Sequence, residues 1–158
     1  MAKSRIKLSP CKLFKLELNV TIAATPKRVW TSLVKHTAAW WPGDFYSSLG
    51  KAKMTIEPWA GGRMFEDRGK GAGAMWGHVT EFHPESIFAI TGHSASRWGG
   101  PSTWILRIEF VVDGKGTRLE IVNDVFGRVD AKHSRDLEQG WMTLFGEALK
   151  QYAERSSK

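Results

Sequence analysis

The stretch SRDLEQGWMTLFGEALKQYAER, roughly residues 134–155, decides the fold of this chain. Its apolar residues recur every three or four positions, so they share one face of a predicted long helix. An apolar stripe of this length needs a broad concave partner, and the strand-like runs upstream can supply one. We therefore expect a curved sheet wrapped around this helix. The stripe consists of Leu137, Trp141, Leu144, Phe145, Ala148, Leu149 and Tyr152.

Two glycines, Gly140 and Gly146, lie inside the same predicted helix. Each costs about 1 kcal/mol relative to alanine in a helix interior. Either the helix backbone passes close to the sheet or to a ligand at these positions, or the two glycines are merely tolerated. The sequence leaves both interpretations open.

The elements upstream of this helix are mostly strands. Residues 14–22 alternate between apolar and polar side chains, which predicts a strand with one buried face. Thr25 and Pro26 then predict the start of a short helix, as an N-cap and a first-turn proline. Residues 37–41 predict one more helical turn. Strand-like runs separated by turn signals follow at residues 51–57, 63–67, 74–82, 86–92, 103–112 and 117–126, while residues 93–102 read as a surface loop.

Length and composition limit what the chain can be. Its 158 residues can bury a sizeable core, and no linker divides them into more than one domain. Cys11 is the only cysteine, so no intramolecular disulfide can form, and no Cys/His cluster has the spacing of a zinc site. We expect no cofactor and no metal. The sequence shows neither a secretory leader nor an eighteen-residue apolar run, so we expect no membrane span and a cytoplasmic location.

The formal net charge of +7 raises the possibility of nucleic-acid binding. The distribution of the charge argues against it, because no basic stripe interleaves with aromatic residues on one element. We expect no nucleic-acid partner. Residues 1–13 are predicted to form a solvated basic arm ahead of a single domain over residues 14–158. The basic residues that cluster near the N-terminus are Lys3, Arg5, Lys7, Lys12 and Lys15, and the others are scattered among acidic ones.

Tryptophan is unusually frequent, with eight residues in the chain. Several of these residues stand beside turns or at strand starts instead of in the middle of a core pattern. A cavity between helix and sheet that such rings line would suit a lipid or an aromatic molecule. For any single tryptophan, simple core filling remains the alternative. The predicted ligand-binding residues are Trp40, Trp41, Phe45, Trp76, His78, Trp104, Leu106, Asn123, Trp141 and Phe145.

Catalytic candidates are few. His78 shares a predicted face with Trp76 and Phe82, and would point inward if Phe82 is buried. Asn123 is a polar residue at a position where alternation predicts an inward side chain, so it needs hydrogen-bond partners if it is buried. No Ser-His-Asp pattern, carboxylate pair or metal triad can be assembled, so no catalytic residue is assigned.

Four segments together resemble one known family. They are VTIAATPKRVWTSLVKHTAAWWP (residues 20–42), IEPWAGGRMFE (56–66), WGHVTEFHP (76–84) and GWMTLFGEALKQY (140–152). In this order they resemble the activator of heat-shock-protein-90 ATPase homologue family, which is part of the START-related (SRPBCC) superfamily. The resemblance covers most of the chain from residue 14 onward.

This resemblance implies an α+β helix-grip fold. A seven-stranded antiparallel sheet would grip the C-terminal helix, and two short helices would follow the first strand. In many relatives the cavity between sheet and helix binds lipids or other apolar molecules, so a binding protein for a small hydrophobic ligand is the leading hypothesis. A cyclase or hydrolase that uses the same cavity and a co-chaperone-like interaction protein are the alternatives. The family has no universal catalytic motif, and its fold alone does not determine a function.

Overall fold

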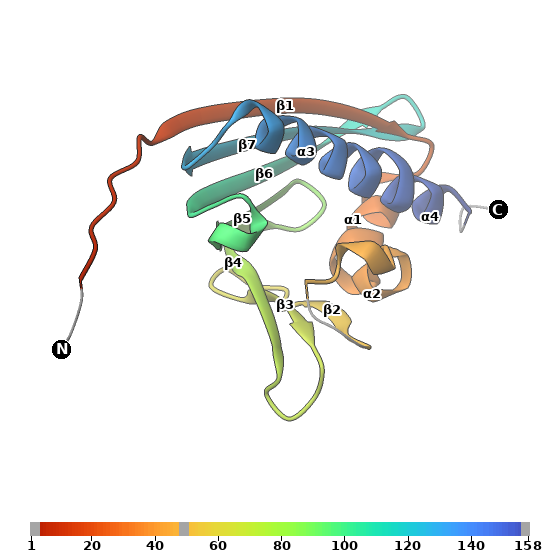
Figure 1. Cartoon of the computed structure of the whole chain (residues 1–158). Helices are drawn as coiled ribbons and strands as arrows, with labels where there is room; N and C mark the ends of the chain where they lie inside the picture. The colour runs from red at the N-terminus through yellow and green to blue at the C-terminus, as the bar shows by residue number, and fades with distance from the viewer. Residues whose placement is uncertain (1–3, 48–50, 156–158) are drawn as a thin grey trace.

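The computed structural model describes residues 4–47 and 51–155. One antiparallel sheet dominates it, with the strand order β1-β7-β6-β5-β4-β3-β2. The C-terminal helix crosses the concave side of this sheet (Figure 1). The α+β helix-grip prediction, with seven strands and short helices after the first strand, is therefore confirmed. The strands are β1 (Lys12–Ile22), β2 (Lys53–Ile56), β3 (Arg63–Asp67), β4 (Gly73–His83), β5 (Ile87–Ser94), β6 (Ser102–Asp113) and β7 (Gly116–Gly127).

The short helices follow β1 directly, at the positions that the sequence predicts. Helix α1 (Pro26–Lys35) begins after Thr25, whose hydroxyl oxygen accepts a hydrogen bond from the backbone N–H of Arg28 at 3.4 Å. Proline at the first helical position loses no hydrogen bond there, because the first N–H groups of a helix lack intrahelical partners. Helix α2 (Thr37–Trp40) and the 3₁₀ turn η1 (Gly43–Phe45) then close one side of the sheet.

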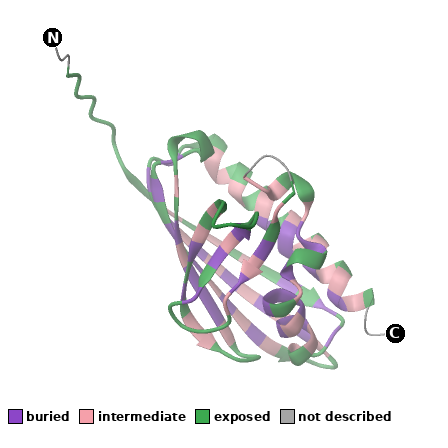
Figure 2. Ribbon diagram, turned by 90° about the horizontal axis from the view of Figure 1, so that it is seen from below, coloured by how far each residue is buried: buried purple, intermediate pink, exposed green. Residues whose placement is uncertain are grey.

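The C-terminal helix begins three residues earlier than the sequence pattern indicates. It consists of α3 (Ala131–Trp141), the π-helical segment η3 (Met142–Leu149) and α4 (Lys150–Arg155). Asp130 caps its start by accepting a 2.7 Å hydrogen bond from the His133 backbone N–H, and this bond lowers the pKa of the Asp130 carboxyl. The predicted apolar stripe faces the sheet, and its fully buried members join a single core cluster. In Figure 2 the buried parts of the helix and of the strands are purple.

Strand β4 changes the face of its side chains twice. Trp76 has no partner in the β3 register, and Thr80 has none in the β5 register, so each is the extra residue of a β-bulge. Between the two bulges, Gly77 and Val79 face the core and His78 is exposed. The prediction that His78 shares the inward face with Trp76 and Phe82 is wrong, because strict alternation fails at each inserted residue.

The connection between β5 and β6 is shorter than the sequence indicates. Strand β5 continues to Ser94, and Ser102 on β6 pairs with it across the sheet. Only the residues between them leave the sheet, including the 3₁₀ turn η2 (Ser96–Trp98). The predicted loop over residues 93–102 is therefore too long, because its glycine-rich sequence includes the paired ends of β5 and β6.

Candidate functional site: an apolar cavity between sheet and helix

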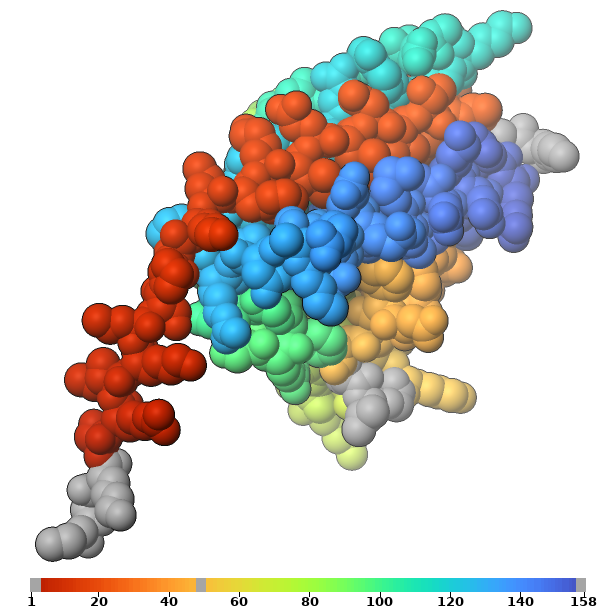
Figure 3. Space-filling model, turned by 45° about the horizontal axis from the view of Figure 1, so that its top comes forward, coloured from red at the N-terminus to blue at the C-terminus, as the bar shows by residue number. Residues whose placement is uncertain are grey.

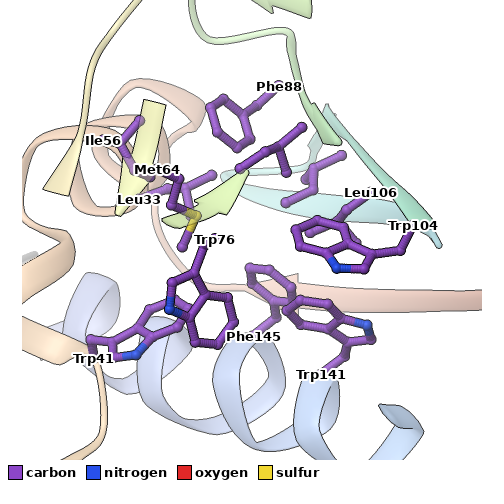
Figure 4. A pocket seen from close by; sticks show the side chains of 12 residues that line it. Leu33, Trp41, Ile56, Met64, Trp76, Phe88, Trp104, Leu106, Trp141 and Phe145 are labelled. Carbon is purple, nitrogen blue, oxygen red and sulfur yellow. The ribbon is translucent and has the colours of Figure 1, made fainter. Parts of the chain in front are cut away.

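A small cavity lies where the C-terminal helix crosses the sheet. Its volume, measured as the space open to the centre of a water molecule, is about 20 Å³. All of its lining side chains are apolar or aromatic, and they come from both layers (Figure 4). A space of this size holds about one water molecule. The lining residues are Leu33, Trp41, Ile56, Met64, Trp76, Phe88, Ile90, Trp104, Leu106, Ile108, Trp141 and Phe145.

One side of the cavity is formed by Trp104, Trp141 and Phe145. The Trp141 and Phe145 rings stack with centroids 5.5 Å apart, and the Trp104 ring meets Trp141 edge-on at 6.4 Å. Glycine on the neighbouring strand makes room for Trp104, because a Cβ at Gly92 would lie only 2.4 Å from the indole. Trp141 is the last residue of α3 and Phe145 lies within η3, so the π-helical segment begins at the cavity wall.

The opposite side contains Trp41 and Trp76, whose rings meet nearly perpendicular with centroids 5.1 Å apart. The Trp76 indole N–H donates a 2.7 Å hydrogen bond to Oε1 of Glu66. Ser47 donates to the same oxygen from its backbone N–H at 2.6 Å and from its hydroxyl at 2.8 Å. Glu66 is completely buried, and several donors converge on its carboxyl group at the N–H edge of the Trp76 indole.

The Trp41 indole N–H is a second polar group in this region. It is buried and has no hydrogen-bond partner in residues 4–47 and 51–155. It is one of five buried side-chain polar atoms without a partner in this part of the chain, so it does not by itself mark a ligand site. In the same part of the chain, no three His, Cys, Asp or Glu side chains stand close enough to hold a metal ion.

Asn123 points inward as predicted, but its amide has two structural partners. Its Oδ1 accepts a 2.9 Å hydrogen bond from the Trp141 indole N–H, and its Nδ2 donates at 3.0 Å to the backbone carbonyl of Ile105. The side chain is completely buried. Asn123 therefore fixes the orientation of Trp141 against the sheet and does not itself line the cavity.

The structure brings six of the ten predicted residues together around the cavity, namely Trp41, Trp76, Trp104, Leu106, Trp141 and Phe145. Of the other four, Asn123 lies behind Trp141. Trp40 is buried and donates its indole N–H to the Ser32 carbonyl at 2.8 Å. Phe45 packs against Trp41 in η1, and His78 is on the outer face of the sheet.

Glu66 was not among the predicted site residues. The alternation of residues 63–67 carries the signal, since Met64 and Glu66 share a face and Met64 is a natural core residue. A carboxylate at an inward position is unusual enough to mark a site. The lining residues Leu33, Ile56, Met64, Phe88, Ile90 and Ile108 were also missed, because their sequence pattern is that of ordinary core positions.

Comparisons with known proteins agree with the helix-grip fold described above. The family model described as Activator of Hsp90 ATPase homolog 1-like protein matches residues 23–154. No curated protein sequence matches the chain at a significant level. Two solved bacterial structures are similar over nearly their whole length. Mll3558 from Rhizobium loti has 17% sequence identity and a TM-score of 0.67, covering 90% of this chain and 99% of that chain. The Aha1 dimer from Colwellia psychrerythraea has 15% sequence identity and a TM-score of 0.59, and the match covers 89% of this chain and 96% of that chain.

A third solved structure, Ara h 8.0201, has 9% sequence identity and a TM-score of 0.68, and the match covers 90% of this chain and 98% of that chain. At these identities the three structures support the fold alone. No helix in the described residues is long and apolar enough to cross a membrane.

Proposed function

Because this chain belongs to the Activator of Hsp90 ATPase homolog 1-like family and has the helix-grip fold, we propose that it binds a small apolar or aromatic molecule between the sheet and the C-terminal helix. The observation that carries the proposal is the lining of the cavity. Four indoles and eight further apolar side chains from both layers converge on one point. Aromatic walls of this kind are typical of sites for apolar ligands.

The polar groups beside the cavity indicate what such a ligand carries. The Trp41 N–H is a buried donor in a residue that lines the cavity, so an acceptor on the ligand could reach it only after the ring moves. A mostly apolar molecule with one acceptor atom would satisfy this buried donor. Glu66 accepts the hydrogen bond of the Trp76 indole and so holds that ring in place.

The present cavity is too small for a lipid or an aromatic ring, so binding requires side chains to move. Trp76 is the best candidate, because it is only half-buried whereas Trp41, Trp104 and Trp141 are buried. Rotation of the Trp76 ring would enlarge the cavity and break its hydrogen bond to Glu66. Ligand binding should therefore change the tryptophan fluorescence.

Binding can be tested with the neutral fluorescent probe N-phenyl-1-naphthylamine and a matched pair of variants. Leu106 lines the cavity, and its neighbour Ile105 is half-exposed on the outer face of the same strand. Leu106→Phe fills the cavity and should abolish saturable binding, whereas Ile105→Phe should bind like the wild type. Circular dichroism checks that both variants are folded. Absence of saturable binding to the wild-type protein, across this probe and a panel of fatty acids and flavonoids, would contradict the proposal.

The hypothesis of an enzyme depends on two residues, and neither is available for catalysis in the cavity. It requires His78 or Asn123 in the cavity beside a charged partner. His78 is exposed on the outer face, and both groups of the Asn123 amide are engaged. Arg107 lies outside the cavity as well, paired with Glu81 at 2.9 Å and with Glu109.

A co-chaperone role is the second candidate, and the family match is the observation that favours it. It predicts a measurable increase in the ATPase rate of the Hsp90 chaperone from the same cell when the purified protein is added. An unchanged rate at a tenfold molar excess would remove this candidate and leave the ligand-binding proposal untouched.

A further inference from the structure

The positive charge of this protein is concentrated at one end of the chain. Residues 1–15 contain five Lys and Arg residues and no Asp or Glu. The other 143 residues carry 18 basic and 16 acidic side chains, a net charge of only +2. The folded body is thus close to neutral, and the N-terminal segment supplies most of the net charge of +7.

This segment also exposes apolar side chains between the charges. Residues 4–11 are exposed throughout and stand away from the body, next to the end where α3 begins (Figure 3). Ile6 and Leu8, which are 86% and 91% exposed, alternate with Arg5 and Lys7. Exposure of large aliphatic groups to water is unfavourable, so a role in solvation alone does not explain Ile6 and Leu8.

The exposed apolar surface continues where the arm joins the sheet. Leu13, the second residue of β1, pairs with Phe126 on β7, and the two side chains are 73% and 61% exposed. Arg128 is exposed two residues after Phe126. The first residue of β6, Ser102, is level with the first residue of β1, because both pair with Gly127. The adjoining turn η2 adds a half-exposed Trp98, over which the Arg97 guanidinium lies 5.2 Å from the ring centroid.

We propose that the basic arm and this end of the sheet bind the surface of an anionic lipid bilayer. The Lys and Arg side chains are attracted to lipid phosphates. The interleaved aliphatic side chains and Phe126 enter the boundary between headgroups and acyl chains, and Trp98 and Arg97 suit the same boundary. A membrane accounts for the charges and the apolar groups together, whereas binding to a nucleic acid accounts only for the charges.

Three acidic side chains at this end have partners within the protein, which reduces their repulsion of lipid phosphates. Asp124 lies 3.4 Å from Lys15, and Asp136 lies 2.5 Å from Lys132. Asp130 caps α3. The proposal is independent of the apolar cavity and goes beyond ligand binding.

The test is co-sedimentation of the full chain with vesicles of phosphatidylcholine alone or with 30% phosphatidylglycerol. We expect binding only to the anionic vesicles, with affinity falling steeply as salt is raised. The variant Arg5→Glu/Lys7→Glu/Lys12→Glu should lose about a hundredfold in affinity, the equivalent of about one kcal/mol for each of the three residues. Ile6→Ser/Leu8→Ser keeps the charge and should weaken binding about tenfold.

The matched control is Lys27→Glu/Lys35→Glu/Lys115→Glu, which changes the net charge by the same amount. These lysines are exposed on α1 and on the β6–β7 turn, away from the arm. This control should bind anionic vesicles nearly as well as the wild type. Equal losses in the two triple variants would overturn the proposal, because attraction would then depend only on net charge. Tight binding of the arm to duplex DNA or RNA with no vesicle binding would also overturn it.

Discussion

Two indole N–H groups beside the cavity each donate to a buried acceptor, but the two arrangements differ in chemistry. Trp141 donates to Asn123, a neutral amide on β7, which is covered by β1 on one side and by β6 on the other. Trp76 donates to Glu66, a carboxylate on β3, with only β2 between it and the sheet edge. Trp141 is buried and Trp76 is half-buried.

The two ends of the cavity therefore differ in the cost of their buried polar groups. The Asn123 pair uses both groups of a neutral amide and carries no charge, so it stabilises the helix on the sheet at little electrostatic cost. A buried carboxylate is costly to desolvate, and several donors converge on one of its oxygens to offset this cost. The Asn123 side thus holds the helix against the sheet, whereas the Glu66 side is the end at which the proposed ligand binding would move a ring.

Trp141→Ala should have the largest effect, since it removes the ring at the centre of the structural side. Truncation of a buried aromatic residue costs about 3–5 kcal/mol in lost contacts and residual cavity. Urea unfolding monitored by circular dichroism should show this loss against a total stability of about 5–15 kcal/mol. The control Lys150→Ala, on the polar side of the helix, should change the unfolding free energy little. Equal stability of the two variants would mean that Trp141 does not anchor the helix.

Glu66→Ala should cause the second-largest loss of stability, because it leaves the Trp76 and Ser47 donors without their acceptor. Hydrogen bonds to charged groups contribute about 1.5–3 kcal/mol each, although some of the donors can rearrange toward water. Glu66→Gln retains an acceptor oxygen and should lose less than Glu66→Ala in the same urea titration. If the alanine variant is as stable as the wild type, the carboxylate is not held in the manner described.

Asn123→Leu should cost about 1–3 kcal/mol, the usual penalty for leaving a buried polar partner unsatisfied. Here the unsatisfied group is the Trp141 N–H, whose acceptor is Asn123 Oδ1. Adding Trp141→Phe removes the indole donor, so the double variant should be more stable than the sum of the two single losses predicts. A double-mutant cycle measures this coupling. Strict additivity would show that the hydrogen bond contributes nothing to stability.

The smallest expected effect is a gain, from Gly140→Ala in α3. A Cβ at Gly140 would lie 3.6 Å from the Phe45 ring, an ordinary contact, so alanine should stabilise the helix by up to about 1 kcal/mol. The two helical glycines are thus tolerated and not required, since a Cβ at Gly146 also meets nothing closer than 3.7 Å. Gly92→Ala is the opposite case, because its Cβ would overlap the Trp104 ring. The midpoint temperature of thermal unfolding should rise for Gly140→Ala and fall for Gly92→Ala.

The sequence by itself determined the long helix, the strands and the inward position of Asn123. Each follows from a local periodicity, 3.6 residues for a helix and two for a strand, which the chain expresses wherever one face is buried. Part of the cavity lining could also be predicted, because Trp104, Leu106, Trp141 and Phe145 lie on predicted inward faces. These features need no knowledge of which strand is the neighbour.

Only the tertiary structure decided the position of His78, the pairing of Glu66 with Trp76 and the size of the cavity. The bulges at Trp76 and Thr80 arise from how β4 pairs with two neighbouring strands. The first inserted residue reverses the inward prediction and the second restores it, so Phe82 packs against the core whereas His78 is exposed. The cavity volume depends on how large rings from both layers interlock, and close packing makes that volume a property of the whole core. No one stretch of sequence contains this information, because the contacts that set it join residues far apart in the chain.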